Sequence, residues 1–380
     1  MTAHERLYLD ANATTAPLPE VVTAVHDALT RTWGNPSSLH EEGRTARRAL
    51  RQATEQAAAL LGCPPEWLTW TSGGTESLNT AVAALAEATT SARRTVLTTG
   101  GEHPAVRQAL ARCTARGQFE VELLPTDELG RVTAEDLAAR LNRRDDVAGV
   151  VVIGAHNETG GVQPLAAIAE LCLAHEIRLI VDGVQWTGKR PIALADAGID
   201  AWAVSAHKFG GPKGVGLLAA RPGWIDAPLI VGGPQQRRRR AGTENIPGIV
   251  GAGVACALAE TEMQSREQRW TTLRDELIAG LRAWPDVDML YDPDGLAQTL
   301  LLALPDWSGS MLAQRLDLEG IAVSTGSACS SGATRASDAL LGLGHDEHLA
   351  ERWIRISFPP RAPRDAASRL LQTLRSILTS

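Results

Sequence analysis

Short apolar runs alternate with amphipathic segments through the middle of the chain. The apolar runs are rich in β-branched residues and end on polar ones, which predicts strands over residues 95–100, 119–125, 147–156, 178–183 and 201–207. Between them, apolar residues recur at helical spacing over 103–117, 133–143 and 164–176. Strands that alternate with helices in this way form βαβ units. We therefore expect an α/β fold with a doubly wound, mostly parallel sheet.

The pattern changes toward the C-terminus. Residues 214–220 form a further strand pattern, and the loop between it and 201–207 is too short for a crossover helix, which predicts an antiparallel pair. A long helical pattern over 249–283 leads into a part with fewer strands. We expect two domains: a large α/β domain over 16–258, and a smaller α+β domain built from 1–15 and 259–380.

Composition and charge exclude several classes of protein. The chain has 44% apolar and 21% charged residues, as globular proteins do, and its net charge of −7 gives no general attraction to nucleic acid or anionic membranes. No apolar run approaches the roughly 20 residues that span a bilayer. The first residues, MTAHERLYLD, lack the pattern of a secretion signal. We therefore expect a cytoplasmic protein that is not bound to a membrane.

The five cysteines differ in their surroundings. They are scattered and contain no CxxC pair, so they predict neither a disulfide framework nor a zinc site. Cys172 and Cys256 lie on apolar helical faces, which is typical of buried structural thiols. Cys329 lies among small residues in STGSACSSG (324–332), where little can bury it. An accessible thiol near a base or cation is a strong nucleophile, so Cys329 is a catalytic candidate.

Polar residues follow the predicted strands at the point where each strand ends. These residues are Glu102 with His103, Asn157, Asp182 with Gln185, and His207 with Lys208. Each alone has an ordinary structural explanation, such as a helix cap. In open α/β sheets, however, ligands bind at the carboxyl ends of the strands, so this set predicts a binding site.

Lysine usage singles out one of these residues. The chain has only three lysines, Lys189, Lys208 and Lys213, although lysine and arginine together number 37. Arginine cannot lose its proton and form a Schiff base, whereas lysine can. We expect this chemistry of Lys208 at its strand end. For Lys189 and Lys213 we expect ordinary solvated loop positions.

A lysine of this kind requires a carbonyl partner, and pyridoxal 5'-phosphate (PLP) is such a partner. PLP also needs an acid at its pyridine nitrogen and a cradle for its phosphate. Asp182 can supply the acid. The stretch TSGGTES (71–77), with Gly74 and Thr75, precedes a helical run, so its backbone N–H groups can bind an anion at a helix N-terminus.

The chain resembles the NifS/IscS-like cysteine desulfurases of the class V aminotransferases, which are fold-type I PLP enzymes. The resemblance extends over nearly the whole length. It rests on YLDANATT (8–15), GNPSS (34–38), TSGGTES, EHPAV (102–106), HNETG (156–160), VDGVQ (181–185), SAHKFGGPKG (205–214), RAGTEN (240–245), STGSACSSG and RISF (355–358). The stretch that follows Cys329 is similar to the long-loop branch of these enzymes.

The resemblance implies a role for each candidate residue. Lys208 would bond the PLP aldehyde, Asp182 would keep the pyridine nitrogen protonated, His103 would stack on the ring and Gln185 would contact the ring hydroxyl. The phosphate would be held by Gly74, Thr75, Ser205 and His207, joined by Thr243 from the other subunit of a homodimer. The substrate carboxylate would be held by Asn35, Asn157 and Arg355, the arginine through a bidentate fork. Cys329 would attack the sulfur of bound L-cysteine, release alanine, and carry a persulfide to an acceptor protein.

Two residues are less regular than the family pattern. Trp186 stands where a small residue is commoner, which predicts different packing near the cofactor, and Asn12 replaces an alanine found in some relatives.

The glycine-rich stretch 248–253 follows no strand, so it does not predict dinucleotide binding. We expect the run Arg237–Arg240 beside the phosphate site and dimer interface, and we do not expect direct binding to nucleic acid.

Several functions stay open from the sequence. Cysteine desulfurase is favoured. A second possibility is selenocysteine lyase or another class V aminotransferase reaction, in which Cys329 would be dispensable. A third is a docking platform in a sulfur-transfer complex. The acceptor is also open. It could belong to iron–sulfur assembly, to thiolation, or to DNA phosphorothioation, whose desulfurases resemble this chain closely.

Overall fold

A seven-stranded sheet forms the centre of the computed structural model, which describes residues 6–225, 228–284, 286–325 and 336–379. Its strands are β2 (Leu68–Thr71), β3 (Thr95–Thr99), β4 (Glu120–Leu124), β5 (Val147–Ile153), β6 (Arg178–Asp182), β7 (Ala201–Ser205) and β8 (Gly216–Ala220), in the spatial order β2-β8-β7-β6-β5-β3-β4. The pairs from β4 to β7 are parallel, whereas β8 is antiparallel to both β7 and β2. The predicted α/β fold and the antiparallel β7–β8 pair are both confirmed.

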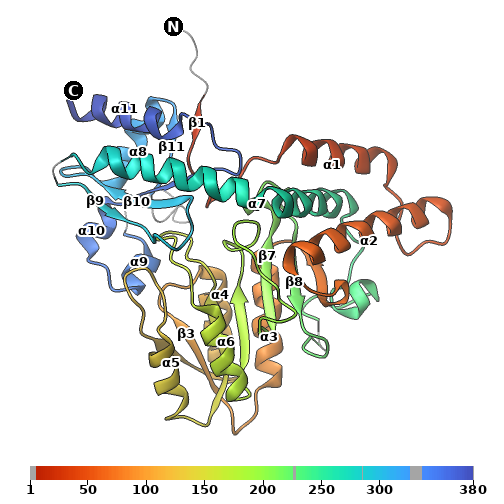
Figure 1. Ribbon diagram of the computed structural model, residues 1–380. Helices are drawn as coiled ribbons and strands as arrows, with labels where there is room; N and C mark the ends of the chain where they lie inside the picture. The colour runs from red at the N-terminus through yellow and green to blue at the C-terminus, as the bar shows by residue number, and fades with distance from the viewer. Residues whose placement is uncertain (1–5, 226–227, 285, 326–335, 380) are drawn as a thin grey trace.

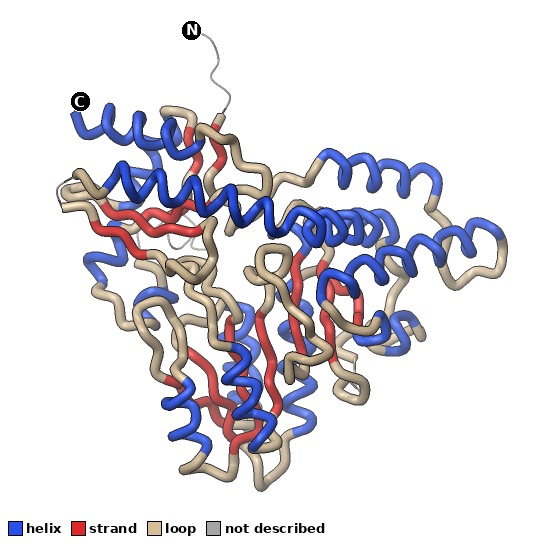
Figure 2. Tube along the Cα trace, in the orientation of Figure 1, coloured by secondary structure: helices blue, strands red, loops and turns tan. Residues whose placement is uncertain are grey.

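Helices cover both faces of this sheet (Figures 1 and 2). Along β5, Val150 and Val152 pack into one core and Val151 into another, because successive side chains of a strand point to opposite faces. The core around Val151 includes α3 (Gly74–Ala88) and α4 (Pro104–Ala115). The opposite core includes α5 (Ala134–Leu141), α6 (Leu165–Ala174) and parts of α2 (Glu41–Leu61) and α7 (Ile246–Leu281). A strand buried on both faces explains the continuous apolar run at β5.

A smaller sheet stands apart from the large one. It is antiparallel, with the order β12 (Ser324–Thr325), β13 (Ile354–Ser357), β10 (Thr299–Ala303), β9 (Asp288–Leu290). Nearby, β1 (Leu7–Tyr8) pairs in parallel with β11 (Ile321–Ala322). Figure 1 shows β1, β11, α8 (Gly309–Leu318) and α11 (Ala366–Thr379) together at one end of the molecule. The remaining helices are α1 (Pro19–Arg31), α9 (Asp338–Gly342) and α10 (Glu347–Arg352), with 3-10 turns η1 (Pro65–Trp67), η2 (Ala206–Lys208) and η3 (Gln235–Arg238).

The long helix α7 joins the two parts. Its residues up to Ala259 pack into the core of the large sheet, and its residues from Trp270 onward pack into a separate core with β1, β10 and α11. This separation supports the division that we propose, with domains over 16–258 and over 1–15 plus 259–380. By length and composition alone α7 could cross a membrane, but half of its most apolar window is buried and it packs along α1, α2 and α11, as a core helix does.

Candidate active site

A cavity of about 710 Å³ lies at the carboxyl ends of β5, β6 and β7. Ile153, Asp182 and Ser205 end these three strands, and all three line it. On the other side the cavity is lined by Ala336 to Ala339 and by Arg355, which belong to the C-terminal part of the chain. The predicted site at the strand ends is therefore a cavity that is closed by the second part of the molecule.

Asp182 is the buried acid of this cavity. Its side chain is 3% exposed, and one carboxylate oxygen accepts a hydrogen bond from the N–H of Val184 at 3.1 Å. Burial raises the pKa of Asp182 to about 6, while the Val184 N–H and the positive charge of Lys208 oppose this shift. The carboxylate is thus mostly ionised near neutral pH, and a cation in the cavity would favour the ionised form further.

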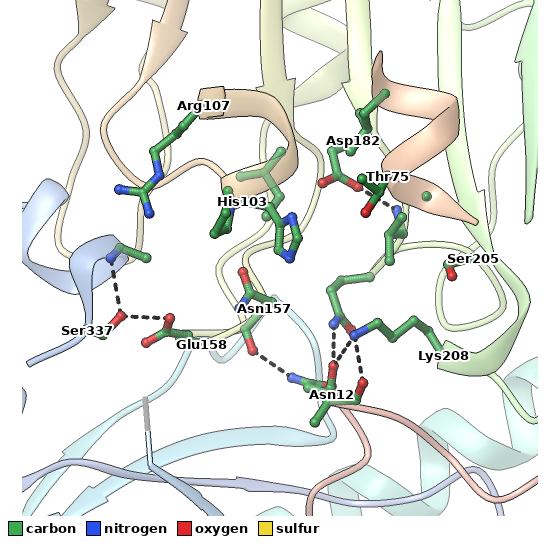
Figure 3. Close-up of a pocket in the computed structure, with 18 of the residues that line it drawn as sticks. Asn12, Thr75, His103, Arg107, Asn157, Glu158, Asp182, Ser205, Lys208 and Ser337 are labelled. Carbon is green, nitrogen blue, oxygen red and sulfur yellow. Dashed lines mark hydrogen bonds between the residues drawn. The ribbon is translucent and has the colours of Figure 1, made fainter. Parts of the chain in front are cut away.

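Lys208 lies in the turn η2, between β7 and β8. Its Nζ donates hydrogen bonds to the backbone oxygens of Asn12 at 2.7 Å and Ala13 at 2.9 Å. These two residues come from the N-terminal segment, so the lysine connects the sheet edge to the start of the chain. Figure 3 shows Lys208 and Asp182 on the same side of the cavity, where an aldehyde and a pyridine ring would need them.

His103 is the N-cap of α4, and its ring lines the cavity. Burial, together with the charges of Lys208 and Arg107, lowers the pKa of His103 to about 4, so the imidazole is neutral. Its Nδ1 accepts a hydrogen bond from the N–H of Ala105 at 3.1 Å, which places the ring proton on Nε2. A flat, neutral ring at this position is suited to stacking on another ring.

The start of α3 could hold an anion. The helix begins at Gly74 without a side-chain cap, so its first N–H groups are open to a ligand, and the Thr75 hydroxyl lies beside them. Ser205 and His207 line the same cavity. Burial and three lysine charges lower the pKa of His207 to about 4, and its Nδ1 lies 3.0 Å from the Thr14 hydroxyl.

Arginine from the basic run also lies beside this cradle. Arg240 Nε donates to Glu76 in the first turn of α3 at 2.9 Å, and Glu76 in turn accepts from the N–H of Ser72 at 2.7 Å. Arg237 and Arg239 donate to the backbone oxygen of Glu66 instead. The expectation that the run lies near the phosphate cradle holds for Arg240.

Arg355 places a buried guanidinium in the wall of the cavity. It is 3% exposed, lies on β13, and donates to Asp10 at 2.8 Å and to the backbone oxygen of Asn157 at 3.1 Å. Its Nε is buried and has no hydrogen-bond partner within the described part of the chain. Asn12 Nδ2 donates to the same Asn157 oxygen at 3.1 Å, so this wall of the cavity is held by a connected set of hydrogen bonds.

Two sequence candidates do not lie at the cavity, and a third lies outside the described residues. Asn35 is exposed, and its side-chain oxygen accepts from the N–H of Ser37 at 2.9 Å. Thr243 is exposed in the segment before α7. Neither lines the cavity of its own chain, and their assigned roles stay predictions. Cys329 lies outside the described residues, but Ser324, five residues earlier, pairs with Arg355 on β13.

Sequence reasoning missed Glu158 and Ser337. Both line the cavity and are buried, and the Ser337 hydroxyl donates to Glu158 at 2.8 Å (Figure 3). Burial raises the pKa of Glu158 to about 7, opposed by Arg355 and by the Ser337 hydroxyl. The signal for Glu158 was its place directly after Asn157. Arg107, one helical turn after His103, also lines the cavity.

The prediction for Lys189 is wrong. This lysine is 5% exposed, not solvated, and its Nζ donates to Gln185 Oε1. The residues after β6 form consecutive turns. Lys189 comes four residues after Gln185, so its side chain reaches the Gln185 amide. Lys213 is exposed, as expected. Trp186, in the same turn, packs edge-on against Trp202 at 5.9 Å and does not line the cavity.

The residues present fit PLP. A buried ionised acid, a lysine, a neutral imidazole and an uncapped helix N-terminus surround one cavity, and they match the pyridine nitrogen, aldehyde, ring and phosphate of that cofactor.

The two buried thiols Cys172 and Cys256, 1% and 2% exposed, lie in the core as expected.

Comparison with known proteins gives a consistent family. The profile of the class-V aminotransferases matches residues 7–370. The chain is 36% identical to cysteine desulfurase IscS of Methanosarcina thermophila, over 99% of this chain and 93% of that protein. It is 41% identical to a cysteine desulfurase of Cereibacter sphaeroides, over 98% and 96%.

Solved structures agree with these relatives. A NifS-like protein superposes with a TM-score of 0.91 at 33% identity, over 98% of this chain and 99% of that one. DndA from Streptomyces lividans superposes with a TM-score of 0.75 at 34% identity, over 92% and 99%. The chain belongs to the class-V aminotransferase family, as a PLP-dependent cysteine desulfurase.

Proposed function

We propose that this cysteine desulfurase binds L-cysteine in the cavity at the ends of β5, β6 and β7 and takes the substrate sulfur on Cys329. The C–S bond of L-cysteine breaks and an S–S bond forms. The thiol of Cys329 becomes a persulfide, and the rest of the substrate leaves as L-alanine, so atoms and electrons balance. The observation that carries this proposal is the convergence of Lys208, Asp182 and Arg355 on one cavity.

The cofactor site accounts for the first half of the chemistry. PLP, when bound, withdraws electrons from the amino acid and so weakens bonds at the carbons near the amino group of the substrate. Asp182, ionised at neutral pH, would hold a proton on the pyridine nitrogen. Lys208 would bond the aldehyde. The open N–H groups at the start of α3 would hold the phosphate.

Arg355 would orient the substrate. Its guanidinium is already fixed by Asp10 and by the Asn157 backbone oxygen, so little side-chain freedom is lost when a carboxylate binds. The buried Nε–H needs an acceptor, and a carboxylate oxygen is a suitable one. Asn35 stays a candidate for the same carboxylate.

Two observations support Cys329 as the sulfur acceptor. Burial raises the pKa of the Cys63, Cys172 and Cys256 thiols to about 12 and raises that of Cys113 as well, so these four carry almost no thiolate near neutral pH. The segment that contains Cys329 begins after β12, which pairs with Arg355, and is followed by Ala336 in the cavity wall. One neighbour of the segment therefore pairs with the strand that carries Arg355, and the other lines the cavity.

We also propose a homodimer. Thr243 is exposed and does not line its own cavity, as expected if it completes the phosphate site of a second subunit. Large apolar side chains stand exposed on and after α1, where a partner would cover them: Val22, Leu29, Trp33 and Leu39, from 54% to 83% exposed.

The sulfur goes on to an acceptor protein, as in other cysteine desulfurases. Iron–sulfur assembly, thiolation and DNA phosphorothioation remain open as the receiving pathway. A cytoplasmic location and the absence of direct nucleic-acid binding stay predictions.

Measuring alanine and sulfide from L-cysteine tests the function. The wild type should form both, Lys208→Ala should form neither, and Lys213→Ala, at the exposed lysine, should behave as the wild type. Cys329→Ser should keep PLP and bind L-cysteine but lose desulfuration by orders of magnitude, because a serine hydroxyl is a poor nucleophile toward sulfur. Alanine formation by Cys329→Ser at the wild-type rate would instead favour a lyase.

A further inference from the structure

Lys189 is a buried lysine directly beside the site. It is 5% exposed and lines a small gap together with Lys208, Thr15 and Phe209. Burial and the positive charges of Lys208 and Arg355 lower the pKa of Lys189 well below its usual value. A lysine held in such unfavourable surroundings needs an explanation from its contacts.

Its contact is Gln185, which is 3% exposed and lines the cavity. Lys189 Nζ donates to Gln185 Oε1, and Gln185 Nε2 donates to the backbone oxygen of Asn12 at 2.9 Å. A backbone carbonyl can only accept, so the amide nitrogen must face Asn12 and the amide oxygen must face Lys189. The two contacts require the same orientation of the amide.

This orientation decides what Gln185 offers to the cavity. One of the two N–H bonds of Nε2 is used by the Asn12 oxygen, which also accepts from Lys208 at 2.7 Å (Figure 3). The second N–H has no partner among the residues that the structure describes, and Gln185 lines the cavity, so an acceptor bound there could take this N–H. With the amide rotated by half a turn, an oxygen would face both the Asn12 carbonyl and the cavity.

We propose that Lys189 is a positioning residue that holds the Gln185 amide with its N–H toward the cavity, as a donor to the ring oxygen of PLP. The proposal rests on the proposed function, because it needs the cofactor in this cavity. Without Lys189, Gln185 Oε1 would be a buried acceptor without a donor, and rotation of the amide would be one way to find a partner. Lys189 removes the reason for that rotation.

The consequence is visible in the cofactor spectrum. An N–H donor disperses the negative charge of the ring oxygen and so weakens its hold on a neighbouring proton. Loss of this donor should raise the pH at which the visible absorption of bound PLP changes. A lysine that acted only through its own charge would move that pH equally with and without Gln185, whereas a lysine that acts through Gln185 would move it only when Gln185 is present.

The test uses purified, PLP-loaded protein in a double-mutant cycle of Lys189→Met and Gln185→Met, with Lys213→Met at the exposed lysine as the matched control. Methionine keeps the length of each side chain without a donor. We expect each single variant to raise the spectral midpoint by about one pH unit and to weaken PLP binding about tenfold. The double variant should be no worse than either single variant, because Lys189 acts through Gln185. The control should match the wild type.

Two results would overturn the proposal. One is a Lys189→Met protein with the midpoint and PLP affinity of the wild type, and the other is full additivity in the double variant. If Lys189→Met does not fold, Lys189→Leu, which also lacks a donor, takes its place in the cycle. The same two results would then overturn the proposal. Failure of the proposed function looks different, since then the wild type has no visible band or the band survives Lys208→Ala.

Discussion

Replacing Glu102 with glutamine should remove much of the stability loss that the protein undergoes as the pH rises from 4.5 to about 8. Glu102 is fully buried, at 0% exposed, between β3 and β5. Its Oε1 accepts from the Thr99 hydroxyl at 2.8 Å and from the N–H of Ile153 at 2.9 Å. Its Oε2 is buried and has no partner among the residues that the structure describes. Burial raises the pKa of Glu102 from 4.5 to about 8, and the charge of Asp182 adds to this.

The magnitude follows from the difference between the two states. Between pH 4.5 and about 8, the unfolded chain has lost the Glu102 proton and the native chain keeps it. The stabilisation is therefore complete below pH 4.5 and is lost as the pH rises to about 8, by about 1.4 kcal/mol per pH unit. At pH 7 the loss is about 3 kcal/mol, to order of magnitude. Glutamine does not titrate and keeps both bonds to Oε1, so it should escape this loss.

Urea unfolding of the cofactor-free protein at several pH values between about 5 and 8 measures this effect, because bound PLP would itself stabilise the native state. Glu102→Gln should become more stable than the wild type as the pH rises. Glu87→Gln, at an exposed glutamate of α3, is the matched control and should run parallel to the wild type. Parallel curves for Glu102→Gln and the wild type would refute a buried, protonated Glu102.

Three further predictions concern the site. Arg355→Ala should weaken L-cysteine binding by ~2–4 kcal/mol in a spectral titration. Asp10→Asn should weaken this binding less, since the guanidinium of Arg355 remains, and equal losses for the two variants would contradict the prediction. Ser337→Ala removes the bond to Glu158 beside the segment of Cys329, so it should slow persulfide formation with unchanged L-cysteine binding, as followed by rapid quench. Thr243→Ala should lower PLP affinity in a dimer, and light scattering that shows an active monomer would contradict the shared site.

The large domain was predictable because its sheet is buried on both faces. Runs such as 147–153 have no polar residue that a solvated strand would need, and their boundaries are set by the polar residues at the strand ends. The same strand ends revealed Asp182 and Lys208. Strands of the small domain, such as Ser324–Thr325, are too short for a hydrophobic period and were not placed individually.

The parts that escaped prediction depend on contacts between distant segments. Lys189 lies in a stretch of ordinary loop composition, and only the turn after β6 shows that its Nζ is buried under Gln185. Glu158 and Ser337 are separated by 179 positions, and no local pattern indicates that they bond. Asn35 and Thr243 came from the family resemblance alone, and the fold of a single chain does not bring them to the cavity.

Locating the transferred sulfur tests the central claim most directly. The PLP-loaded protein is mixed with one equivalent of L-cysteine, the persulfide is trapped by alkylation, and peptides are analysed by mass spectrometry alongside alanine. We predict one additional sulfur atom on Cys329 for each alanine formed, and none on Cys63, Cys113, Cys172 or Cys256. Alanine formed while Cys329 carries no additional sulfur, or sulfur found on one of the other four cysteines, would contradict the account.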